Sequence, residues 1–573
     1  MAEATTAAHD GGAAPHPGVR SMPQWQTGEL VDAPTFRLRN WAALIGPGLV
    51  MGGAAIGGGE WLTGPVVTAK YGGGLLWLAT LSILGQVIYN LEISRYALYS
   101  GEPIFTGKFR TPPGPLFWLT VYLVLDFGSV FPYLAANASI PVATLILGAL
   151  PDPEHVPAHR YLIRGLSYVI FLGALVPLLV GGKVYNSLKV VMSFKIAVVL
   201  SFLLLTALLF SHPATWKDIL TGFVRFGTVP VRVSEAQSGP AISPDQTAAA
   251  EPPDAVAESG GSDEPSEAAS VHLDNIFVSL WQGRGFPAID FTLIGFIAAM
   301  VAIAGSGGLT NTPISNYTRD QGWGMGWHVG AIPSVFGGRN IQLSHVGCVF
   351  LPTAENLPRW RRWYRHVMRD QLAVWMPACF VGLALPCVLS VEFLPRGTRA
   401  DNWTAAAMTA GAVRDHVGAT VNPSLGQAFW FMTLFCGFLV LGPSVASSAD
   451  GLIRRWVDVL WTASPKLRQV SPQHIGKVYF RVVLVFACFG LIMLSLNSPT
   501  QLLRFATLVM NFALGFSCWH ALAVNVLLLP RELRPNWFMR LGLVAAGAFF
   551  SLLATVALLD QLGFLTRWTS SPA

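Results

Sequence analysis

The chain has 573 residues, of which 52% are hydrophobic and only 12% are charged, whereas soluble domains carry roughly 25% charged residues. This composition excludes a soluble protein and predicts an all-α polytopic membrane protein. The net charge of +6 does not indicate nucleic-acid binding, because the basic residues are scattered through short loops between apolar stretches.

Apolar stretches near the length that spans a bilayer predict about eleven transmembrane helices. In chain order they lie near residues 41–68, 73–98, 115–148, 161–181, 186–211, 289–313, 371–391, 425–447, 478–496, 500–529 and 538–560. The third stretch is long enough to bend at Pro132 or Pro141. Because the dense Arg clusters fall in alternate loops, the positive-inside rule places these loops and the N-terminus in the cytoplasm. We expect an integral protein of the bacterial inner (plasma) membrane, with the lipid bilayer as a partner and no nucleic-acid partner.

The parts outside these stretches differ in composition. Residues 1–36 are polar and rich in Ala, Gly and Pro, which predicts a disordered cytoplasmic tail before the transmembrane domain, residues 37–573. Residues 212–288 form a predicted external loop, whose acidic centre at 234–270 is expected to be disordered. Residues 319–369 form a predicted cytoplasmic segment, Gly-rich at first and ending in an Arg/Trp helix at the membrane interface.

Two of the apolar stretches contain glycine clusters. The first contains Gly57, Gly58 and Gly59 followed by Glu60, and the sixth contains VAIAGSGGLTNTP at 301–313. Paired interruptions at corresponding places in two five-helix halves indicate a transporter built as an inverted repeat, with its site at the midplane. Unwound backbone in lipid is costly unless it lines a cavity. The predicted substrate-binding residues are Gly57, Gly58, Gly59, Glu60, Gly305, Ser306, Gly307, Gly308, Thr310 and Asn311.

Each of these candidates has a structural alternative. Glycines in membrane helices also serve close helix packing, and Glu60 could lie near the outer interface instead of at the midplane. Asp126 in the third stretch and His520 in the tenth are candidate proton or cation relay residues. Asp126 could instead satisfy a polar group of a neighbouring helix, and His520 could be a packed, hydrogen-bonded histidine.

Three segments resemble the Nramp metal-ion transporters. They are GPGLVMGGAAIGGGEWLTGPVVTAKYGGGLLW (46–77), GQVIYNLEISRYALYSGEP (85–103) and LGPSVASSADGLIRRWVDVLW (441–461). The resemblance implies a LeuT-like 5+5 inverted repeat with discontinuous helices 1 and 6, and transport of divalent transition metals with protons.

The chain departs from this family at the residues that bind metal. The family's DPGN motif reads Gly57, Gly58, Gly59, Glu60 here, and residues 302–308 contain neither the Met nor the His of its MPH motif. A site of oxygen ligands alone suits Mg, Ca or Mn. Glu60 is then the candidate metal ligand, completed by carbonyls near Gly57 and Gly305 and by the hydroxyls of Ser306 and Thr310.

The leading hypothesis is a secondary active transporter that moves a divalent metal cation, coupled to an ion gradient because the sequence has no nucleotide-binding motif. The alternative is a transporter of an amino acid or another small organic solute on the same fold. A remote alternative is an intramembrane enzyme using Asp126, His520 and Glu60, which no catalytic motif supports. We therefore expect no enzymatic activity and no cofactor.

Overall fold

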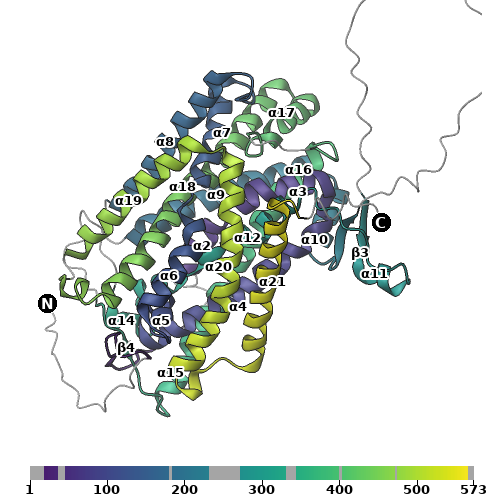
Figure 1. The fold of residues 1–573 in the computed structure, drawn as a ribbon. Helices are drawn as coiled ribbons and strands as arrows, with labels where there is room; N and C mark the ends of the chain where they lie inside the picture. The colour runs from purple at the N-terminus through teal and green to yellow at the C-terminus, as the bar shows by residue number, and fades with distance from the viewer. Residues whose placement is uncertain are drawn as a thin grey trace, which may run out of the picture.

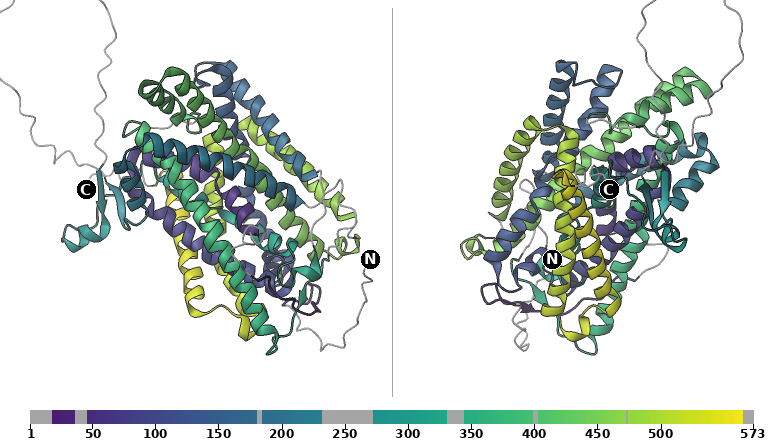
Figure 2. Two further views of the ribbon diagram at one scale, coloured as in Figure 1. Left: turned by 180° about the vertical axis from the view of Figure 1, so that it is seen from behind. Right: turned by 45° about the vertical axis from the view of Figure 1, so that its right-hand side comes forward.

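The computed structural model describes residues 18–35, 46–179, 184–231, 272–330, 344–398, 403–471 and 474–564. In these residues the chain is an all-α bundle (Figure 1) with two small sheets at its ends. The strand β1 (Gln26–Thr27) pairs in parallel with β4 (Cys348–Val349), and β2 (Thr228–Val231) pairs antiparallel with β3 (His272–Asn275). The β2–β3 hairpin and the neighbouring short helix α11 project from the bundle, as the turned views in Figure 2 show.

The helices of the first half are α2 (Pro47–Ala55), η2 (Gly59–Thr63), α3 (Gly64–Tyr71), η3 (Gly72–Leu75), α4 (Trp77–Ser100), α5 (Ile104–Phe109), α6 (Pro115–Leu125), η4 (Phe127–Val130), α7 (Tyr133–Leu147), α8 (Pro157–Leu179), α9 (Val184–Phe210) and α10 (Pro213–Gly222). Those of the second half are α11 (Ile276–Trp281), α12 (Ile294–Ile303), η6 (Gly308–Asn311), α13 (Pro313–Asp320), α14 (Gly326–Val329), α15 (Asn356–Asp370), η7 (Gln371–Trp375), α16 (Met376–Phe393), α17 (Met408–Thr420), α18 (Pro423–Ala463), η8 (Leu467–Gln469), α19 (Ile475–Leu496), α20 (Pro499–Leu528), η10 (Arg531–Leu533) and α21 (Trp537–Gln561).

Many of these helices are suited to a bilayer. Within the described ranges nine are long and apolar enough to span it, and Pro47–Leu75 with Trp77–Ser100 form a further pair bent by 96°. Large apolar side chains are exposed along the outer helices, for example Val169 on α8, Val485 on α19 and Leu552 on α21. Such surfaces are stable only against lipid or a partner. The chain is an integral membrane protein, while the number of spans and the inverted repeat stay predictions.

Two helices extend beyond their predicted spans. The eighth predicted span ends at residue 447, but α18 continues to Ala463 because the charged residues of its last turns are buried and paired within the protein. The seventh predicted span begins at residue 371. In the structure α15, the π-helical η7 and α16 form one helical run, so the helix begins before that residue.

The prediction of a disordered tail through residue 36 is wrong for residues 18–35. Met22, Trp25 and Leu30 of this segment are buried, and the Val19 N–H donates to the Arg110 carbonyl at 2.9 Å. The apolar side chains of the segment give it surface to bury, which a fully polar tail would lack. Residues 1–17, and the acidic centre of the loop at 234–270, lie outside the described residues.

Both predicted helix breaks are present at the centre of the bundle. The first interrupts the run between α2 and η2, and the second separates α12 from α13. The two broken helices touch at Gly59, where a Cβ would lie 2.3 Å from the Ile303 carbonyl oxygen. In the second break Gly305 and Gly307 have φ values of +108° and +70°, a region that side chains disfavour. Glycine is therefore required both for close packing and for the turn.

The contact at Gly59 predicts a stability effect. Gly59→Ala should lower the free energy of unfolding by about 1–3 kcal/mol, because the added methyl group overpacks the α12 backbone. Thermal unfolding of the detergent-purified protein measures this. The control is Gly165→Ala on α8, where a Cβ would meet nothing within 4 Å, and where alanine should be neutral or slightly stabilising. Equal melting temperatures for the two variants would contradict the packing role.

Candidate functional site

Glu60 joins the two helix breaks. Its side chain is fully buried, and one carboxylate oxygen accepts a hydrogen bond from the Gly57 N–H at 2.9 Å while the other accepts from the Gly305 N–H at 3.1 Å. A carboxylate accepts such bonds more strongly than a neutral group does. Glu60 therefore satisfies an unwound amide in each broken helix and holds the breaks against one another.

Gln86 on α4 satisfies most of the second break. Its Oε1 accepts hydrogen bonds from the N–H groups of Ser306 and Gly307, at 3.0 and 3.2 Å, and from Asn311 Nδ2 at 2.8 Å. Its Nε2 donates to the Ala304 carbonyl at 2.7 Å. One buried amide side chain thus supplies hydrogen-bond partners to three backbone groups of the unwound segment and to the Asn311 side chain.

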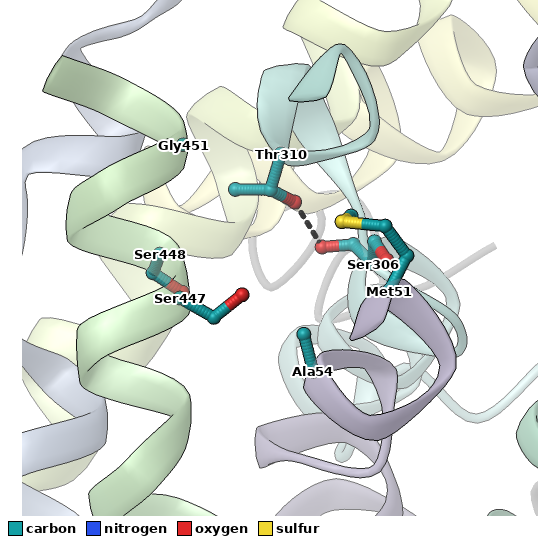
Figure 3. A pocket seen from close by; sticks show the side chains of 7 residues that line it. All are labelled: Met51, Ala54, Ser306, Thr310, Ser447, Ser448 and Gly451. Atoms are coloured by element: carbon teal, nitrogen blue, oxygen red, sulfur yellow. Dashed lines mark hydrogen bonds between the residues drawn. The ribbon is translucent and has the colours of Figure 1, made fainter. Parts of the chain in front are cut away.

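A small cavity lies between the two breaks and α18 (Figure 3). Its volume is about 30 Å³, above the roughly 10–15 Å³ that one water requires. Figure 3 shows the side chains from α2 and from the second break facing the serines of α18. The lining residues are Met51, Ala54, Ser306, Thr310, Ser447, Ser448 and Gly451.

The polar atoms of the second break are not all satisfied. Thr310 Oγ1 donates to the carbonyls of Ser306 and Gly307. Within the described part of the chain, Ser306 Oγ and Asn311 Oδ1 are buried and have no hydrogen-bond partner. Buried oxygens of this kind are uncommon in native proteins and each calls for an explanation. A cation or a polar ligand in the cavity would supply the missing partner for Ser306.

The predicted site residues fall into three groups. Ser306 and Thr310 line the cavity. Glu60 meets Gly57 and Gly305 beside it, without being among the lining residues. The remaining positions serve packing or hydrogen bonding: Gly58, Gly59, Gly307, Gly308 and Asn311.

Sequence reasoning missed several lining residues. Met51 precedes the first break by one helical turn. Its thioether is a soft donor that comes from the first broken helix, whereas the MPH motif of the Nramp family has its Met in the sixth. Ser447 and Ser448 belong to the Ser-rich eighth-helix segment but carry no signal that they face the breaks. In the ranges that the structure describes, no cluster of three or more His, Cys, Asp or Glu side chains could hold a metal. The side chains that line the cavity offer hydroxyls and a thioether to a ligand.

Asp126 is held in a buried ion pair. Its carboxylate accepts from Arg455 Nε at 2.8 Å and from the second guanidinium nitrogen at 2.5 Å, and from Trp456 Nε1 at 2.7 Å. Arg455 also donates to the Leu309 carbonyl at 3.3 Å. The pair therefore ties the end of α6 and the second break to α18.

His520 lies in a packed aromatic cluster. Its two ring nitrogens contact the Tyr122 hydroxyl at 2.7 Å and Thr111 Oγ1 at 2.8 Å. Its ring centroid lies 4.0 Å from that of Trp118. His520 does not line the cavity between the breaks, and Asp126 does not either. The relay role of both residues stays a prediction.

A second group of buried charges joins α13 to α18. Arg319 contacts Asp458 at 2.9 Å, Arg454 contacts Asp450 at 3.1 Å, and Arg454 also pairs with Asp320. All of these side chains are almost completely buried. They hold α13, the half-helix that follows the second break, against the part of α18 next to the cavity residue Gly451.

Solved structures share this fold. A crystal structure of a single-residue mutant of the Eremococcus coleocola manganese transporter aligns with a TM-score of 0.54 at 14% sequence identity, covering 95% of this chain and 91% of that chain. The same transporter in complex with an aromatic bis-isothiourea substituted compound aligns with a TM-score of 0.51, 14% identity and the same coverage. No family model and no curated protein matches the sequence. The likeness establishes that this chain has the fold of that transporter.

The Asp126–Arg455 pair predicts a strong energetic coupling. Asp126→Ala should cost about 3–5 kcal/mol of unfolding free energy, because it leaves a buried guanidinium without its partner. Combining it with Arg455→Met should cost much less than the sum of the single changes. A double-mutant cycle by chemical or thermal unfolding measures this coupling.

The exposed Asp274–Arg284 pair, at 2.9 Å, serves as the control, and its coupling should be at most about 1 kcal/mol. Additive costs at Asp126 and Arg455 would show that the pair does not act as a unit.

Proposed function

We propose that this protein is a secondary active transporter that carries a divalent metal cation, and that the cation binds in the cavity lined by Met51, Ser306, Thr310, Ser447 and Ser448. The fold of a manganese transporter supports this proposal. So does the coincidence of both helix breaks with one polar cavity, since unwound membrane helices serve binding sites in transporters. We also place the protein in the bacterial inner membrane with its N-terminus in the cytoplasm, on the distribution of Arg clusters.

The observation that carries the proposal is the unpartnered Ser306 hydroxyl. It is buried at the second break, in a cavity of about 30 Å³. A volume that admits only one or a few water molecules fits a cation that has lost most of its hydration shell. The hydroxyl and thioether donors that line the cavity favour a cation over the organic solutes that the same fold could carry.

The donor set indicates which cations suit the site. Hydroxyls are hard donors, whereas the Met51 thioether favours softer transition metals. The presence of this thioether modifies the expectation of a site with oxygen ligands alone. Glu60 contributes negative charge from beside the breaks, where its oxygens accept amide hydrogen bonds. We therefore propose Mn²⁺ or a similar transition-metal ion as cargo in preference to Mg²⁺.

Ser306→Ala separates binding from folding. Within the described ranges the Ser306 hydroxyl has no hydrogen-bond partner, so its removal should leave the melting temperature unchanged or slightly higher. The dissociation constant for Mn²⁺ should rise about tenfold, equivalent to about 1.4 kcal/mol. Titration calorimetry of the purified protein with Mn²⁺ measures the change.

Ser94→Ala is the matched control, because Ser94 Oγ on α4 is also buried without a partner but lies outside the cavity. It should bind Mn²⁺ as the unaltered protein does. Mn²⁺ binding that Ser306→Ala leaves intact would remove this hydroxyl from the site, and failure of the unaltered protein to bind any divalent metal would overturn the proposed function.

A further inference from the structure

Lys195 is a buried amine in the middle of a transmembrane helix. It lies on α9 and its exposed fraction is 0%. Its Nζ donates to the Val440 carbonyl at 2.8 Å and to Ser444 Oγ at 2.6 Å, both on α18. Among the described residues both hydrogen-bond partners of this amine are neutral. An ionisable group inside a membrane bundle with only neutral partners is costly, and such groups mark ion pathways by default.

The amine lies next to the first helix break. Ser444 Oγ, which accepts the hydrogen bond from Lys195, is 3.5 Å from the Ala54 carbonyl at the end of α2. Ala54 in turn lines the cavity. Lys195 is thus two contacts away from the proposed cation site, and the hydrogen bonds that it makes join α9 to α18 at the level of that site.

The acidic side chain at the neighbouring helix break is Glu60, whose two carboxylate oxygens accept from the Gly57 and Gly305 N–H groups. Among the described residues, none of the titratable groups on the other elements that pack against α9 forms a hydrogen bond or an ion pair with Lys195. The α2 range contains no titratable side chain, and α16 contributes the Cys379 and Cys387 thiols together with Glu392, which contacts His212 at 2.5 Å. On α8, Tyr168 contacts Ser495 at 2.7 Å and Arg160 donates to the Pro153 carbonyl. The α18 groups at the amine are the neutral Val440 and Ser444.

We propose that Lys195 is a proton-binding site whose occupancy is linked to the binding of the cation between the two helix breaks. This inference rests on the proposed function and deepens it, because it identifies a side chain outside the cavity whose proton is linked to the cation. The step is a simple acid–base exchange, in which the ammonium gives its proton to water and becomes a neutral amine.

Two physical effects link the proton to the cation. An ammonium has three N–H donors and a neutral amine has two, so protonation strengthens the contacts that join α9 to α18. A divalent cation in the cavity repels the ammonium across Ser444 and Ala54, with little solvent to screen the repulsion. Proton binding should therefore weaken cation binding, and cation binding should release a proton.

The sign of the pH dependence follows from this repulsion. Because the cation prefers the neutral amine, its apparent affinity should rise with pH until Lys195 is deprotonated and should then level off. Below that point each unit of acidification should weaken Mn²⁺ binding by up to about tenfold, the limit for one linked proton. Calorimetric titration of the full-length purified protein with Mn²⁺ over a series of pH values measures the slope. Repeating it in buffers with different ionisation enthalpies measures the protons released.

Two substitutions at Lys195 should act in opposite directions. Lys195→Gln keeps a neutral donor and should bind Mn²⁺ with the high-pH affinity at every pH and release no proton. Lys195→Arg keeps the positive charge and should bind weakly at every pH. Lys189→Gln on the same helix is the matched control and should retain the slope of the unaltered protein. Size-exclusion profiles and melting temperatures show that each variant is folded.

The possible results separate the two claims. A pH slope and proton release that disappear in both Lys195 variants but not in Lys189→Gln would support the inference. If the slope and the proton release persist in Lys195→Gln, Lys195 is not the linked site, although the proposed function stands. If the unaltered protein binds no divalent metal at any pH, the proposed function fails and the linkage fails with it.

Discussion

The structure depends on one constraint: backbone N–H and C=O groups released inside a membrane protein need partners within the protein. Two helices are unwound at the centre of the bundle, and Glu60 and Gln86 supply most of the missing hydrogen bonds. Because Glu60 contacts both breaks, their positions are fixed relative to each other. The breaks therefore form one preorganised unit, and the cavity beside them has a defined shape.

This arrangement places the acidic side chain of the first break beside the cavity instead of in its lining. Glu60 stabilises the break from within, while the cavity is lined by hydroxyls and by a thioether on α2. Charge is then distributed around the site instead of being concentrated in it. Glu60 and Lys195 lie beside the two breaks and the cavity, and the buried pairs on α13 and α18 hold the surrounding helices.

The sequence was sufficient for the membrane architecture and for both helix breaks, because glycine clusters in apolar stretches are strong local signals. It was not sufficient for the lining of the cavity. Met51 and Ser447 look like ordinary helix residues, and only the packing of α2 against α18 brings them together. Gln86 was missed for the same reason, since four of its five hydrogen bonds reach residues more than two hundred positions away. The order of residues 18–35 was missed because a few buried apolar side chains outweigh a polar composition.

The central claim is that the two helix breaks share one cation site. The most direct measurement is an anomalous difference map from crystals of the full-length protein grown with Mn²⁺, recorded near the manganese absorption edge. A peak is expected between Met51, Ser306 and Ser447, within coordination distance of at least one hydroxyl oxygen. A manganese peak elsewhere in the bundle, with this cavity filled by side chains, would contradict it.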